Sequence, residues 1–224
     1  MTTVTISYFS DVLCVWAYFA QPRIDEVQRN FGASVQFDHR FCSVFGDTVL
    51  KIQTAWGAKG GYQGFSAHLH HSAEAFPEIS LHPDLWLTVR PASSMAPHLV
   101  LKAVQLLENR GSAPTGSAEA AIRGMRRAFF ETALDISQWA VQREVLQASG
   151  VDLIAAQDVI QDGRAYAALA SDYQEAEALR LQGSPSFVLN EGRQKLYGNV
   201  GYRIIEANIQ ELLRAPQPDQ ASWC

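Results

Sequence analysis

Three cysteines, Cys14, Cys42 and Cys224, are the residues of this chain best suited to covalent chemistry. An odd and sparse set does not form a structural disulfide framework, so the question is which thiol is reactive. Cys14 follows an apolar–polar alternation over residues 4–9 and precedes a helical pattern, which places it at a strand-to-helix turn. Unpaired N–H groups and the helix dipole stabilise a thiolate there, so we expect Cys14 to be a nucleophile with a lowered pKa.

The elements around Cys14 predict a β-α-β unit. Residues 4–9 are typical of a strand, and residues 34–41 of a second one. Between them a helix is expected, capped by Ser10 or Asp11 and kinked at Pro22. Because β-α-β strands run parallel, Cys42 would lie near the same sheet edge as Cys14. Two alternatives stay open for Cys42: a thiol that resolves mixed disulfides, or a packed thiol without a role.

The rest of the chain predicts a helical block followed by a hairpin and a last helix. Residues 46–92 are rich in Gly and Pro and are expected to be a long loop or to hold short helices. The expected elements after it are helices over 96–107, 118–134, from Asp135 to Gly150, 153–161 and 163–181, strands over 186–189 and 194–197, and a helix over 201–214. In that last helix Ile204, Ile205, Ile209, Leu212 and Leu213 should face inward, and residues 215–224 should form a flexible tail. The order predicts one α/β sheet with an inserted helical subdomain.

The composition of the chain argues against nucleic acid and membranes as its partners. The 224 residues are 47% hydrophobic and 18% charged, with a formal net charge of −5, which is typical of a globular protein. No run of Lys and Arg suits nucleic acid, and no apolar stretch suits a membrane span. The first residues do not resemble a secretory leader, so a cytoplasmic protein is expected. An exposed helical insertion could support a homodimer.

Two segments carry a family resemblance: residues 10–18, SDVLCVWAY, and residues 183–188, GSPSFV. The first is similar to the Asp-x-x-Cys-Pro-Trp-Cys-Tyr motif, and the second to the Gly-Val-Pro-Thr-Phe-Val segment, of the DsbA-like oxidoreductase family, FrnE-type members especially. The resemblance implies a thioredoxin-like fold built from residues 1–45 and 183–214, with residues 46–182 as a loop and helical insertion. It also implies a cis Pro185 opposite Cys14, and a Ser184 backbone that docks an extended substrate.

The departure from the family motif leaves three functions open. Ala17 stands where the family has its second cysteine, and Val15 replaces its proline. Cys14 could work alone as a thiol-disulfide oxidoreductase, with glutathione as the resolving co-substrate. The chain could instead resemble the kappa-class glutathione transferases and 2-hydroxychromene-2-carboxylate isomerases, which bind glutathione without a Cys-x-x-Cys pair and act on small electrophiles. The third alternative is a peptide-binding module that kept the fold and lost the chemistry.

Other candidate residues carry weaker signals. Trp16 flanks the thiol and is either a substrate platform or ordinary packing. His98 begins a helix and would assist the thiol only if folding brings the two together. His68, His70 and His71 are close in sequence, but their spacing completes no zinc site, so neither a metal nor a tightly bound cofactor is expected.

Overall fold

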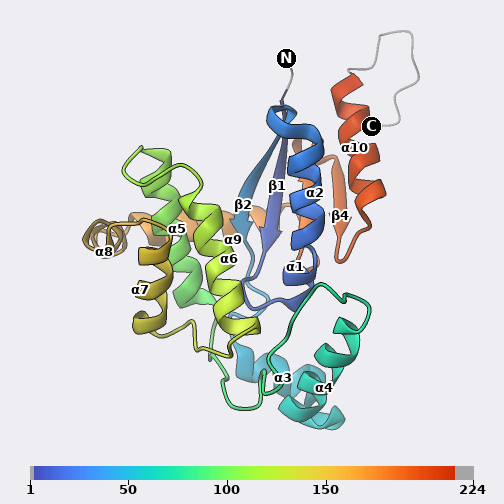
Figure 1. The fold of residues 1–224 in the computed structure, drawn as a ribbon, viewed down its shortest axis with the longest axis vertical. Coiled ribbons are helices and arrows are strands. Elements are labelled where there is room, and N and C mark those ends of the chain that lie inside the picture. The colour runs from blue at the N-terminus through green and yellow to red at the C-terminus, as the bar shows by residue number, and fades with distance from the viewer. Residues whose placement is uncertain (1–2, 215–224) are drawn as a thin grey trace.

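A mixed four-stranded sheet forms the centre of the protein, which we describe from a computed structural model over residues 3–214 (Figure 1). The strand order is β2-β1-β3-β4, with β1 and β2 parallel and the other two neighbouring pairs antiparallel. The strands are β1 (Val4–Ser10), β2 (Val35–Phe41), β3 (Ser186–Leu189) and β4 (Gln194–Tyr197). The predicted α/β architecture is therefore confirmed. The expected tail over 215–224, with Cys224, lies outside the described residues.

Two consecutive helices, α1 (Val15–Phe19) and α2 (Gln21–Phe31), replace the single kinked helix that the sequence predicts. Pro22 lies in the first turn of α2, where its missing N–H costs nothing, so the chain breaks at Ala20. Cys14 itself is the N-cap residue of α1. The expected cap at Ser10 or Asp11 is therefore wrong, since both side chains are buried on other partners.

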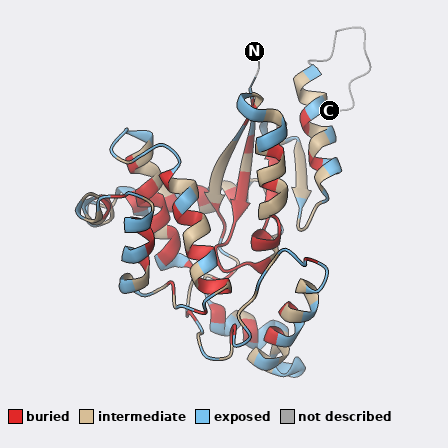
Figure 2. Ribbon diagram, in the orientation of Figure 1, coloured by how far each residue is buried: buried red, intermediate tan, exposed pale blue. Residues whose placement is uncertain are grey.

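The sheet and the helices α2 and α10 (Tyr202–Arg214) enclose one hydrophobic core, seen as the buried residues of β1, α2 and α10 in Figure 2. Ile205 and Ile209 are fully buried there, as their spacing predicts. Ile204 is 53% exposed, so its expected inward orientation is wrong. Its side chain lies about 100° around the helix from Ile205, on the outer face.

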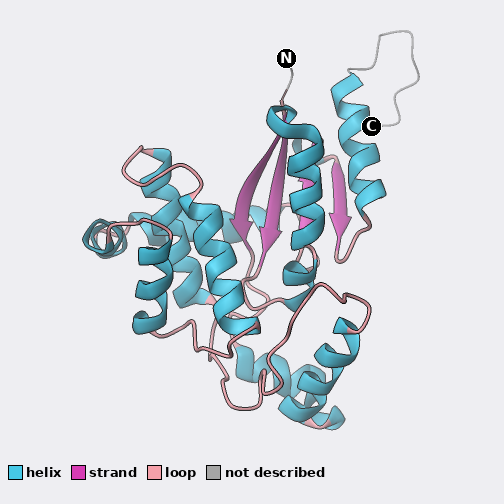
Figure 3. Cartoon of the chain, in the orientation of Figure 1, coloured by secondary structure: helices cyan, strands magenta, loops and turns pink. Residues whose placement is uncertain are grey.

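The glycine-rich segment after β2 contains two helices, α3 (Thr48–Trp56) and α4 (Gly61–Ala73), and is not mainly loop (Figure 3). Asp47 caps α3 by accepting a hydrogen bond from the Leu50 N–H at 2.9 Å. The turn between the helices needs glycine: a Cβ on Gly64 would lie 1.8 Å from the Lys59 carbonyl oxygen. The sequence allows short helices in this segment but does not predict their bounds, because their glycines interrupt the apolar periodicity.

Five further helices form the rest of the insertion. They are α5 (Met95–Asn109), α6 (Ser117–Phe130), α7 (Trp139–Ala148), α8 (Leu153–Gln161) and α9 (Arg164–Ala178). The expected helix start at Asp135 is wrong: that carboxylate accepts hydrogen bonds from the N–H and hydroxyl of Ser137 in a turn, and α7 begins at Trp139. Over residues 3–214, no helix is both long and apolar enough to cross a membrane.

Candidate active site around Cys14

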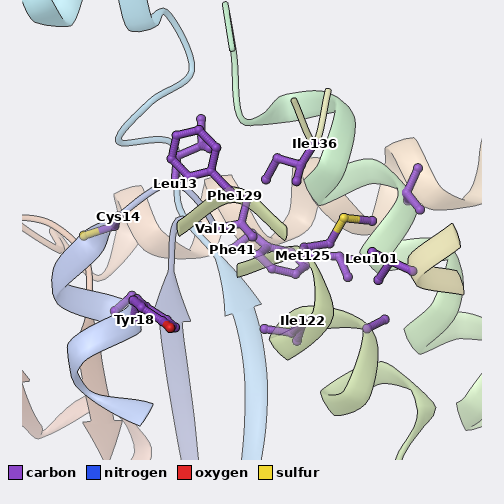
Figure 4. Close-up of a cluster of buried hydrophobic side chains, with 14 of the residues drawn as sticks. Val12, Leu13, Cys14, Tyr18, Phe41, Leu101, Ile122, Met125, Phe129 and Ile136 are labelled. Carbon is purple, nitrogen blue, oxygen red and sulfur yellow. The ribbon is translucent and has the colours of Figure 1, made fainter. Parts of the chain in front are cut away.

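The thiol of Cys14 lies at the junction of the sheet and the helical insertion. The Cys14 N–H donates to the Asp11 carbonyl oxygen at 3.0 Å, which shapes the turn between β1 and α1. The thiol donates to the Ser184 carbonyl oxygen at 3.2 Å, a contact across 170 residues of sequence. Figure 4 shows the sulfur pointing away from the insertion core that Met125 and Phe129 form. The residue is only 5% exposed.

Burial raises the pKa of the Cys14 thiol above its ordinary value. Hydrogen bonds from the Ser184 side chain and from the backbone of Ala17 and Trp16 oppose that rise, while the charge of Asp11 adds to it. The expected lowering of this pKa is therefore wrong. The physical reason is that α1 is only five residues long and the sulfur is removed from water, so desolvation of the thiolate outweighs the helix terminus.

Asp11 organises the loops that hold Cys14. Its fully buried carboxylate accepts four hydrogen bonds, from the N–H groups of Leu13, Val44 and Phe45 and from the Ser94 hydroxyl, at 2.7 to 2.9 Å. These donors come from the β1–α1 loop, the loop after β2, and the residue before α5. One carboxylate thus fixes three segments around the thiol, a role that the sequence analysis missed because Asp11 resembled a helix cap.

His98 contacts the backbone ahead of Cys14. Its Nε2 accepts from the Val12 N–H at 3.0 Å, which leaves Nδ1 to carry the proton and donate to the Tyr173 hydroxyl, also at 3.0 Å. The ring is fully buried, and burial lowers the pKa of His98 to about 4. His98 is therefore neutral at pH 7 and supports the loop between Asp11 and Cys14.

Ser184 connects the far end of the chain to this loop. The Ser184–Pro185 peptide bond is cis, and the Ser184 hydroxyl accepts from the Asp11 N–H at 2.9 Å. The Ser184 side chain lowers the pKa of both the Cys14 and the Cys42 thiol, against the larger effect of burial. Both thiols are free, and burial raises the pKa of Cys42 as well. Folding therefore brings Cys14, Ser184, Pro185 and Cys42 to one place.

A cavity of about 270 Å³ opens beside the thiol, bounded by the start of α1, by the loops after β2 and before β3, and by the α3–α4 pair. Its lining comprises Cys14, Val15, Trp16, Val44, Phe45, Lys51, Trp56, Phe65, His68, Leu69, Gly183 and Ser184. A larger cavity of about 630 Å³ lies elsewhere, at the β2 edge, but contains no thiol. The smaller cavity is therefore the candidate active site.

The walls of this cavity are aromatic, and a lysine provides its positive charge. Trp16 is half-buried and packs edge-on against Phe19, so it is both wall and core. His68 packs on Trp56 at 4.9 Å between ring centroids. The segment expected to be a long loop or to hold short helices supplies Lys51, Trp56, Phe65 and His68, which the sequence did not indicate as residues of this site. The only signal was the Asp47 cap ahead of α3.

Two further expectations concern metals and Ala17. His68, His70 and His71 lie on α4 and not in a loop, and residues 3–214 contain no group of three potential metal ligands. Ala17 is the third residue of α1 and is fully buried. Because it is an alanine, it supplies no second thiol. Cys42 is the other cysteine within the described chain.

The chain matches the model of a known family. The model of the DSBA-like thioredoxin domain matches residues 5–210. The chain belongs to this family. Its thioredoxin-like fold with a helical insertion follows from that match and from the mixed sheet. No curated protein sequence matches the chain.

Solved structures similar to this chain include both oxidoreductases and an isomerase. A probable DsbA oxidoreductase from Streptomyces coelicolor is 21% identical, with a TM-score of 0.74 over 98% of this chain and 94% of that one. The cytosolic disulfide reductase DsbM from Pseudomonas aeruginosa is 20% identical, with a TM-score of 0.69 over 95% and 100%. A 2-hydroxychromene-2-carboxylate isomerase is 15% identical, with a TM-score of 0.64 over 94% and 96%. At these identities the likeness concerns the fold.

Proposed function

We propose that this member of the DSBA-like family is a thiol-disulfide oxidoreductase that acts through Cys14 alone. The observation that carries the proposal is the Cys14 thiol at the mouth of an aromatic cavity, held by the Ser184 carbonyl next to Pro185. A substrate that enters this cavity would displace the thiol from that carbonyl and would find the Ser184 backbone free to pair with it. Trp16 would support the substrate beside the sulfur.

The reaction needs one thiolate and one external thiol. Cys14 loses its proton to solvent, and its sulfur attacks a disulfide R–S–S–R′, forming Cys14–S–S–R and releasing R′–S⁻. Ala17 supplies no second thiol, so a glutathione thiolate then attacks the sulfur of R. That step forms R–S–S–glutathione and returns the Cys14 thiolate. Lys51 in the cavity wall would offer its ammonium to a carboxylate of glutathione.

One comparison supports glutathione as the resolving thiol and the cytoplasm as the setting. One solved structure similar to this chain, at 20% identity and a TM-score of 0.67, is the cytosolic disulfide reductase DsbM with GSH. A cytoplasm rich in glutathione would supply the resolving thiol continuously. Glutathione would act there as a co-substrate and not as a tightly bound cofactor.

A second candidate is a glutathione-dependent isomerase or transferase that acts on a small electrophile. The raised pKa of Cys14 favours it, because a protonated thiol is a weak nucleophile but can donate a hydrogen bond to the thiolate of bound glutathione. In this function Cys14 would position glutathione and form no covalent bond. Serine at position 14 would then preserve the function.

Mass spectrometry separates these candidates. The folded protein is treated with mild diamide and glutathione, with Cys14→Ser and Cys42→Ser as matched variants. The oxidoreductase that acts through Cys14 alone predicts a glutathione adduct on Cys14. A Cys14–Cys42 disulfide would instead assign the resolving step to Cys42. No adduct on folded protein, with full modification of unfolded protein, rejects the oxidoreductase. Saturable glutathione binding that survives Cys14→Ser then supports the second candidate, and a protein that neither binds glutathione nor reacts is left as a binding module.

A further inference from the structure

The larger cavity, of about 630 Å³, lies along the outer edge of β2 and takes no part in the chemistry at Cys14. β2 is the first strand in the order of the sheet, so its outer edge has no strand neighbour. In Figure 1 the insertion helices α5, α6 and α9 lie on this side of the sheet. Residues of β2, α5, α6 and α9 all line the cavity, whose volume falls within the range of ligand sites in proteins.

The register of the sheet decides which backbone groups face this cavity. Ser10 pairs with Phe41, and the Cys42 N–H donates to the Ser10 carbonyl. In a parallel pair this pattern directs the N–H and C=O of even-numbered β2 residues to β1. The backbone groups of the odd-numbered residues, among them Phe37 and His39, therefore point outward into the edge.

Side chains of the insertion occupy only part of this outer edge. The Phe41 N–H donates to the Asp172 carboxylate at 2.9 Å, and the His39 carbonyl accepts from the Gln105 side-chain amide at 2.7 Å. Over residues 3–214 the outward N–H and C=O of Phe37 have no protein partner, and the outward N–H of His39 has none. One added strand would find a donor and an acceptor on Phe37 and a further donor on His39.

Gln105 is a replaceable partner. Its amide nitrogen occupies the place that a strand N–H would take, while its carbonyl oxygen is shielded from solvent and has no hydrogen-bond partner within the described chain. An unpaired buried carbonyl is unfavourable. A peptide N–H that takes over the His39 carbonyl would let the Gln105 side chain turn outward and hydrate its oxygen. The His39 carbonyl can therefore become a further acceptor for an added strand once the Gln105 side chain has left it.

The charges of the cavity favour a basic occupant. Four carboxylates line it, those of Asp38, Glu108, Glu119 and Asp172, against the two cations Arg40 and Lys102. His39 does not alter this balance at pH 7, because burial lowers its pKa to about 4. A segment with lysine or arginine side chains on its outer positions would meet a negative surplus.

We propose that the outer edge of β2 is a docking site for an extended basic peptide segment of a partner protein, which adds to the sheet as a fifth strand at Phe37 and His39. The site is separate from the Cys14 cavity, so a partner could be held there while one of its disulfides reaches Cys14. The proposal does not depend on the thiol chemistry, and a peptide without cysteine tests it alone.

The test is an NMR titration of the full ¹⁵N-labelled chain with the acetylated, amidated peptide Lys-Val-Lys-Val-Lys-Val. Saturable shifts of the Phe37 and His39 amides, with the Ser184 amide unmoved, are the expected result. The same peptide with every backbone nitrogen methylated should bind at least about tenfold more weakly, because it has no strand donors. A peptide with glutamate in place of lysine should also bind more weakly at low salt.

A gain-of-function variant sharpens the test. Gln105→Ala frees the His39 carbonyl and should tighten the lysine peptide about three- to tenfold, the effect of one hydrogen bond. Three results would overturn the proposal: no shift of Phe37 and His39 at millimolar peptide, equal binding of the methylated peptide, or shifts confined to the Cys14 cavity. The last would mean that the peptide binds as a substrate analogue and not at the edge.

Discussion

Acid should weaken this protein through His98, and the size of the effect follows from its burial. The ring is neutral in the folded state, with its pKa lowered to about 4 against 6.5 in the unfolded chain. A histidine with a lowered pKa leaves stability untouched at pH 7, where both states are neutral. Below pH 6.5 the unfolded chain takes up the proton and the folded one does not, so stability falls until about pH 4. Between pH 7 and pH 5 the loss from this one group is about 2 kcal/mol.

Urea unfolding at pH 7 and pH 5 measures this loss in three proteins. His98→Gln keeps an acceptor for the Val12 N–H and a donor for Tyr173, but does not titrate, so its stability should fall about 2 kcal/mol less than that of the wild type. His71→Gln changes a side chain that is 81% exposed and should behave like the wild type. His39 is present in all three proteins, so its contribution cancels in the comparison. If His98→Gln and the wild type lose the same stability, His98 is not buried as a neutral ring.

Three other predictions test the thiol, the insertion and its ion pair. Alkylation of Cys14 should accelerate with a midpoint above the free-cysteine value of about 8.5, since burial raises its pKa; a midpoint below that value, measured with Cys14→Ser as blank, contradicts the burial. Gly64→Ala should cost about 2 kcal/mol or more of unfolding free energy, because its Cβ would lie 1.8 Å from a carbonyl oxygen, whereas Gly57→Ala in the turn before α4, with no atom within 4 Å, should not destabilise; equal effects in urea would refute the close approach. Lys102→Met should cost about 3 kcal/mol by leaving the buried Asp172 short of its partner at 2.5 Å, and adding Asp172→Asn should recover part of it. Arg164→Met, in an exposed pair, is the control and should leave the urea midpoint unchanged.

Local patterns in the sequence were enough to predict the strands of the thioredoxin-like part. Strands β3 and β4 begin and end at the predicted residues, because the apolar run of β3 and the hairpin signal over residues 190–193 depend on local chemistry alone. The strand-to-helix turn at Cys14 was predicted for the same reason, and so was the parallel pairing of β1 and β2. The bounds of the helices α3 and α4 were not predicted. Their glycines allow the close approach of Gly64 to the Lys59 carbonyl, which is visible only in three dimensions.

The behaviour of the Cys14 thiol was decided by tertiary structure. The sequence alone placed the thiol at a helix start and argued for a low pKa, whereas the insertion and the Ser184 segment bury it and raise that pKa. Burial is a sum over segments far apart in the chain, so no local pattern contains it. The same holds for Asp11, whose four hydrogen bonds come from three segments, and for Cys42, which lies near Cys14 and Ser184 only in the folded chain. The sequence by itself determined which atom could react, and the tertiary structure decided how readily it gives up its proton and which groups surround it.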